Sequence, residues 1–80
     1  MTRVEITYCV PCGHLDRAQS LQERLLSTFG RELEAVSLVT GDSGVFTVHV
    51  DGDLVFDKAD DEYDPDAIVE TVRGRVSAAD

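Results

Sequence analysis

The hydrophobic pattern changes its period early in the chain. Residues 3–8 alternate polar and apolar side chains and include several β-branched residues, which predicts a strand with one buried face. Over residues 14–29 the apolar positions instead recur every three or four residues, which predicts a helix. Gly30 directly after this segment predicts where the helix ends. The apolar face of the helix is formed by Leu15, Ala18, Leu21, Leu25, Leu26 and Phe29.

The middle of the chain predicts three further strands. Residues 33–40 are rich in aliphatic side chains, residues 45–51 alternate, and residues 54–56 form a short apolar run. Turn-forming residues occupy positions 40–44. The Asp-Gly pair at 51–52 predicts a tight type I′ hairpin, because both residues tolerate positive φ.

A second helix closes the predicted order. It follows the acidic loop 57–64, and Asp64 and Pro65 are suited to its N-cap and its first position. With no repeat and no long linker, the order β-α-β-β-β-α predicts one domain over residues 1–80. One parallel βαβ crossover and an antiparallel hairpin fit an α/β two-layer sandwich. The apolar face of the second helix is Ile68, Val69, Val72 and Val76.

The charge of the chain excludes several classes of partner. Among 80 residues, 16 are acidic and 7 are basic, and the formal net charge is −9. Because phosphate binding needs clustered Lys and Arg, we expect no nucleic-acid partner. No apolar run approaches the length of a membrane span, so we expect a cytoplasmic protein without a membrane partner. The acidity, with Lys58 as its single lysine, is also typical of salt-loving microbes. We interpret it as halophilic adaptation, which stability rising with KCl would support.

The main chemical motif is Cys9-Val10-Pro11-Cys12, placed between the first predicted strand and helix. This spacing serves redox pairs and zinc sites. A structural zinc site needs four ligands, and beyond this pair the chain offers no third cysteine and only two histidines. At the start of a helix, free N–H groups and the helix dipole favour a thiolate. The pattern therefore favours a redox pair, with zinc binding as the weaker alternative.

The neighbours of the two cysteines have possible supporting roles. Val10 and Pro11 lie between them, and Pro11 suits the first turn of the helix, where its missing N–H has no cost. Gly13 allows close approach of the chain or a partner. His14 adds positive charge when protonated, or does nothing measurable. Tyr8 packs beside the disulfide or, as we expect, fills core space at the strand end.

Other possible sites are weaker. Phe46 and Phe56 fall on predicted strands and are expected in the core. The acidic run after residue 56 lacks the ligand pattern of a calcium loop. No Ser-His-Asp arrangement and no GxGxxG fingerprint is present, so we expect neither a metal nor another cofactor.

Three segments resemble the selenoprotein W-like redox family, which also includes selenoproteins T and H. They are the Cys motif with its preceding tyrosine, the end of the first helix, and the Gly-Val-Phe to Asp-Gly hairpin. The similarity extends from about residue 3 to residue 76. In this sequence the three segments are 8–12, 25–29 and 44–56.

The resemblance implies a thioredoxin-like fold and thiol redox activity. The selenium-containing members carry selenocysteine at the position of Cys12, which favours Cys12 as the attacking group and Cys9 as the resolving thiol. Analogy with thioredoxin favours the opposite order, so both stay open here. The cis-proline of thioredoxin is missing, because no proline precedes the later strands. Expected partners are protein or small-molecule thiols and disulfides, with an external reductant. The alternative is a non-catalytic module whose binding the cysteine pair switches.

Overall fold

The secondary structure follows the predicted order β-α-β-β-β-α. A computed structural model describes residues 2–79, with side chains for residues 2–76, so positions 1 and 80 of the predicted domain lie outside it. Most boundaries agree with the predictions within two residues, and a short 3-10 helix, η1, was not predicted. The elements are β1 (Thr2–Cys9), α1 (Leu15–Phe29), η1 (Gly30–Glu32), β2 (Leu33–Gly41), β3 (Phe46–Val50), β4 (Asp53–Asp57) and α2 (Pro65–Ala79).

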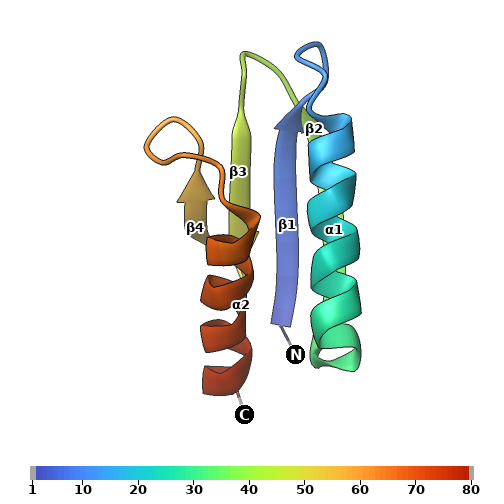
Figure 1. Cartoon of the computed structure of the whole chain (residues 1–80), viewed down its shortest axis with the longest axis vertical. Helices are drawn as coiled ribbons and strands as arrows, with labels where there is room; N and C mark the ends of the chain where they lie inside the picture. Colours follow the sequence, from blue (N-terminus) through green and yellow to red (C-terminus); the bar gives the residue numbers. More distant parts are fainter. Residues whose placement is uncertain (1, 80) are drawn as a thin grey trace.

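The four strands form one mixed sheet in the order β2-β1-β3-β4. β1 is parallel to β2 and antiparallel to β3, and β3 is antiparallel to β4. Both helices lie in front of the sheet in Figure 1, so the molecule has one helical layer and one sheet layer. This is the predicted α/β two-layer sandwich with thioredoxin-like topology. Neither helix of residues 2–79 combines the length and the apolar character of a membrane span.

The core lies between the sheet and the helices. Alternate residues of β1 and β3 point toward the helices and are buried, whereas their neighbours, apart from Cys9 at the end of β1, are exposed or half-buried. The predicted apolar face of α2 is buried, and so are Ala18, Leu21, Leu25 and Phe29 of α1. Leu15 and Leu26 are each 43 % exposed, so their assignment to the buried face of α1 is wrong. Phe46 and Phe56 belong to this core, as predicted. Its largest fully buried side chains include Phe46, Ile6, Leu21, Leu25, Val4, Val48, Val50 and Val72.

Two local predictions, the β3–β4 hairpin and the N-cap of α2, are confirmed. Asp51 and Gly52 have φ values of 52° and 87°, the positive values that a tight hairpin between β3 and β4 requires. At the start of α2, the Asp64 carboxylate accepts hydrogen bonds from the N–H groups of Asp66 and Ala67, at 3.0 and 3.3 Å. Asp64 is therefore the N-cap that the sequence indicates.

Candidate redox site

A disulfide joins the end of the inner strand β1 to the turn that follows it. Cys9 is the last residue of β1, and its Cα lies 5.3 Å from that of Cys12 in the bonded pair. Gly13 has a φ of 76°. Its N–H donates to the carbonyl of Val10 at 3.2 Å, while the N–H of His14 donates to the carbonyl of Cys9 at 3.4 Å. These two bonds close a tight turn that places the cysteines side by side.

The two cysteines differ in their access to solvent. Cys9 is 0 % exposed, although the alternation along β1 would leave its position partly exposed. Cys12 belongs to the exposed part of the turn. A second molecule can therefore reach Cys12 from solvent, whereas Cys9 is shielded from it.

Gly41 at the end of β2 fixes the strand end that carries Cys9. Its carbonyl accepts a hydrogen bond from the N–H of Val10 at 3.1 Å, and it is the register partner of Cys9. A Cβ at Gly41 would lie 2.7 Å from Cγ1 of Val45 and 3.2 Å from Cγ2 of Thr7. The sequence places Gly41 in a turn and gives no signal that it supports the cysteine pair.

Pro11 is not in the first turn of α1, so that prediction is wrong. The helix begins at Leu15, with His14 at the N-cap position. The positive φ of Gly13 is incompatible with a helix, so the helix cannot begin before this residue. Pro11 and Cys12 thus lie in a separate exposed turn, and Cys12 precedes the first helical residue by three positions.

Tyr8 and His14 both pack against the core. Tyr8 is 8 % exposed and belongs to the hydrophobic cluster, as predicted. His14 makes no side-chain cap and lies edge-on to Phe46, with their ring centroids 6.0 Å apart. Its Nδ1 is buried without a hydrogen-bond partner among the described residues. The structure therefore connects the turn to the core through an imidazole ring.

Arg17 extends this contact to an aromatic cluster, a feature that sequence reasoning missed. Its guanidinium lies 4.7 Å from the ring centroid of Tyr63 and 5.8 Å from that of Phe46. Tyr63 is also edge-on to Phe46 and to Phe56. Burial raises the pKa of the Tyr63 hydroxyl, although the positive charges of Arg17 and Arg24 oppose the shift. Helical spacing could have predicted that Arg17 lies near His14, three positions earlier in the chain. It could not have predicted the contact with Tyr63.

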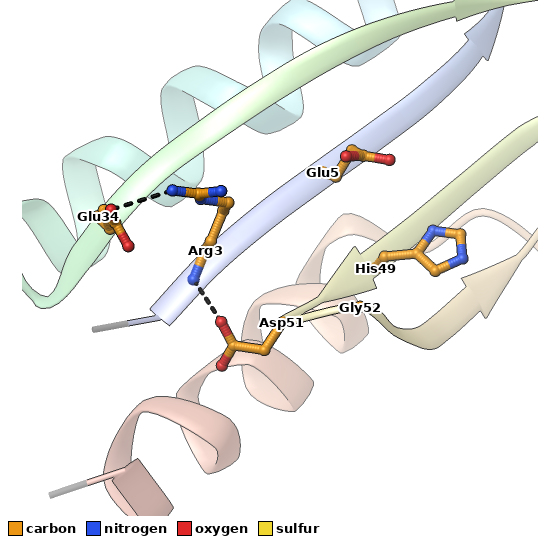
Figure 2. A pocket seen from close by; sticks show the side chains of 6 residues that line it. All are labelled: Arg3, Glu5, Glu34, His49, Asp51 and Gly52. Carbon is orange, nitrogen blue, oxygen red and sulfur yellow. Dashed lines mark hydrogen bonds and ion pairs between the residues drawn. The ribbon is translucent and has the colours of Figure 1, made fainter.

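A hollow of about 520 Å³ lies on the face of the sheet that the helices leave uncovered (Figure 2). It contains neither cysteine. The N–H of Arg3 donates to Oδ1 of Asp51 at 2.9 Å, and the Arg3 guanidinium pairs with Glu34 at 3.1 Å. These contacts occupy most of its charged groups. In the part of the chain that is described, no three His, Cys, Asp or Glu side chains gather as metal ligands. The cysteine turn is therefore the stronger candidate site.

Comparison with known proteins places the fold and motif in one family. The sequence profile of the Rdx family matches residues 3–74. A crystal structure of a protein from Bordetella parapertussis is 36% identical with a TM-score of 0.87, covering 92% of this chain and 96% of that one. A selenoprotein W-related protein from Vibrio cholerae is 26% identical with a TM-score of 0.86, covering 94% and 96%. No curated protein sequence matches the chain. The chain belongs to the Rdx family, the selenoprotein W-like group that its motifs resemble.

Proposed function

We propose that the protein is a thiol–disulfide redox protein whose cysteine pair cycles between a dithiol and an intramolecular disulfide. The observation that carries the proposal is the asymmetric pair itself, one buried and one exposed cysteine joined at the end of the inner strand β1. Membership of the Rdx family supports a redox role. A cysteine pair without a framework of structural disulfides fits a reducing compartment, so the proposal includes a cytoplasmic location.

Each cycle transfers two electrons. The thiolate of Cys12 attacks one sulfur of a substrate disulfide, forms a mixed disulfide and releases the other substrate sulfur as a thiolate. The thiolate of Cys9 then attacks the Cys12 sulfur and releases the second substrate thiolate. The substrate disulfide is thereby reduced, and the pair is oxidised to the Cys9–Cys12 bond. An external dithiol reductant restores both thiols.

Burial favours Cys12 as the attacking group. A substrate disulfide must approach the attacking sulfur in line, which the complete burial of Cys9 obstructs. Once the mixed disulfide forms on Cys12, the attack by Cys9 needs no access from solvent, because the two Cα atoms are only 5.3 Å apart. This order agrees with the one that the family resemblance favours.

Cysteine variants test both the activity and the order of attack. We expect reduced Cys9→Ser to form a stable mixed disulfide with dithiobis(nitrobenzoate), because Cys12 still attacks but nothing resolves the product. Reduced Cys12→Ser should react at least about tenfold more slowly, since its only thiol is buried. Stopped-flow release of thionitrobenzoate measures the rates, and mass spectrometry measures the trapped adduct. Circular dichroism of both variants controls for folding.

Turnover separates a redox enzyme from a redox-sensitive binding module. With excess dithiothreitol as the donor, the wild type should reduce hydroxyethyl disulfide faster than buffer, and Cys12→Ser should lose this turnover. Cys9→Ser should keep part of it, because dithiothreitol can resolve the mixed disulfide on Cys12 in place of Cys9. A wild type no faster than buffer would rule out the enzyme and leave the binding module. Faster trapping by Cys12→Ser than by Cys9→Ser would reverse the order of attack.

A further inference from the structure

The two edges of the sheet are protected to different degrees. β4, at one edge, is only five residues long, begins and ends with aspartate, and pairs through an irregular register. β2, at the other edge, is nine residues long and has no charged residue and no proline over positions 35–41. Charges, irregular pairing and short length normally prevent other chains from adding to an edge. The β2 edge lacks these protections over most of its length.

A side chain of α1 forms a hydrogen bond with one carbonyl of the β2 edge. The Nε2 of Gln22 donates to the carbonyl oxygen of Val36 at 2.7 Å, so the polar backbone groups of Val36 point away from β1. In a parallel strand, the backbone N–H and C=O groups of successive residues point alternately to the two sides. The groups of Leu38 and Thr40 therefore also point away from β1. No described side chain bonds to either of them. Leu38 and Thr40 therefore leave free hydrogen-bonding groups in the half of β2 that ends at Gly41.

This free half of β2 ends beside the turn of residues 10–13, which carries Cys12 and is called the redox turn below. Cys9 is the register partner of Gly41, whose carbonyl binds the N–H of Val10. Figure 1 shows the turn after β1 projecting beyond the ends of β1 and β2. A strand added to β2 would lie about 4.8 Å from it and would extend past the turn that carries Cys12. Val39, 36 % exposed, would offer that strand an apolar neighbour.

We propose that residues 38–41 of β2 dock an extended segment of a protein substrate by strand addition, so that the segment presents its disulfide to Cys12. The inference rests on the proposed function and narrows its substrate class to protein disulfides in extended, uncharged segments. Backbone hydrogen bonds supply the binding and accept many sequences. Small disulfides without a peptide backbone still react, but they gain nothing from this edge.

Two N-methylated peptides test the docking without altering the protein. Each peptide is uncharged and carries one cysteine in a mixed disulfide with thionitrobenzoate, and alternate residues are N-methylated in one of the two possible sets. Because the cysteine fixes the register against Cys12, only one set faces β2. We expect that set to slow the reaction of the reduced protein about fivefold or more, the effect of losing one or two hydrogen bonds. The other set should match the unmethylated peptide. Equal rates for the two methylated peptides would overturn the proposal.

A proline substitution tests the same edge from the side of the protein. Thr40→Pro removes one outward N–H from an edge strand, where proline is tolerated. It should slow the unmethylated peptide about fivefold relative to dithiobis(nitrobenzoate). Thr40→Ala keeps the N–H and should keep the wild-type ratio of the two rates. An equal loss with both substrates would overturn the docking role.

Two further measurements separate this inference from the proposed function. If neither the peptide nor the small disulfide reacts, the redox function fails, but docking is still measurable with a serine version of the peptide. That peptide should shift the NMR amide signals of residues 38–41, and unchanged signals would overturn docking. Sedimentation tests the other possible occupant of this edge. A dimer that Thr40→Pro dissociates would assign the edge to a second copy of the chain and overturn the proposal.

Discussion

The two faces of the sheet have opposite chemistry although the same strands build both. Val4 and Ile6 of β1 are fully buried beneath the helices, whereas the alternate residues Arg3 and Glu5 are exposed on the other face. On the covered face, aromatic and aliphatic side chains pack together. On the open face, side chains meet water or pair as Arg3 does with Glu34. The covered face therefore accounts for most of the stability, and the open face tolerates polar change.

The redox turn begins where the alternation between the covered and the open face of β1 ends. The alternation of burial along β1 stops at Cys9, which is buried next to the buried Tyr8. The chain then leaves the sheet through an exposed turn to reach α1. One cysteine thereby belongs to the protein interior and the other to its surface. The comparison of the two faces can be tested at the centre of the core, at the strand end near the turn, and at the solvent boundary.

The largest expected effect is at Phe46, the largest fully buried side chain. Phe46→Ala should lower the free energy of unfolding by about 3–5 kcal/mol, because it leaves a cavity beneath His14, Phe56 and Tyr63. Its neighbour Thr47 is half-buried on the open face, and Thr47→Ala should cost less than about 1 kcal/mol. Urea unfolding measures both.

If Phe46→Ala does not fold, Phe46→Leu provides a smaller truncation at the same site, with an expected loss of about 1–3 kcal/mol. Similar losses for the Phe46 and Thr47 variants would contradict the assignment of stability to the covered face.

An intermediate effect is expected at Gly41. A methyl group there meets Val45 and Thr7 at close range, so Gly41→Ala should destabilise the fold by about 1–3 kcal/mol. Gly74 in α2 has no atom within 4 Å of an added Cβ, and Gly74→Ala should instead stabilise by about 0.5–1 kcal/mol. Thermal melts of the oxidised variants compare them. Equal shifts in the same direction would show that backbone entropy, rather than contact at Gly41, governs both positions.

The smallest effect is at Tyr63, where the covered face meets water. Burial raises its pKa in the folded state, so the folded protein holds this proton more tightly than the unfolded chain. The resulting stability is fully present below about pH 10 and is lost as the pH rises toward the folded pKa. Tyr63→Phe keeps the ring but removes the proton. Urea midpoints at about pH 8 and pH 11 should therefore fall less for Tyr63→Phe than for the wild type. An equal fall would contradict the assignment to Tyr63.

The sequence predicts those features that repeat or that use distinctive turn residues. The change of period places the strands and helices, Asp51-Gly52 identifies the hairpin, and Asp64 identifies the N-cap. The spacing of Cys9 and Cys12 predicts the bonded pair. These features depend on neighbours in the chain, so local patterns are sufficient to find them.

The features that sequence analysis missed depend on contacts between distant segments. Gly41 supports the cysteine strand only because parallel pairing places it opposite Cys9. Arg17 meets Tyr63 only after α1 and the loop before α2 pack together. The misplacement of Pro11 has a local cause, because only the backbone shows that Gly13 has left the helical region. The halophilic adaptation and the cytoplasmic location stay predictions.

The Cys9–Cys12 bond spans only three positions of sequence, and this short span has a consequence for the durability of the fold. In the chain-entropy account, a disulfide stabilises a protein by restricting its unfolded chain, with an effect that grows with the closed loop. A loop this short restricts the unfolded chain by about 2 kcal/mol, against about 5 kcal/mol for a loop of roughly 100 residues. Opening the bond thus releases little chain entropy. In the proposed redox cycle, opening and closing this bond therefore changes the stability of the fold by less than half as much as a disulfide that closed a loop of roughly 100 residues would.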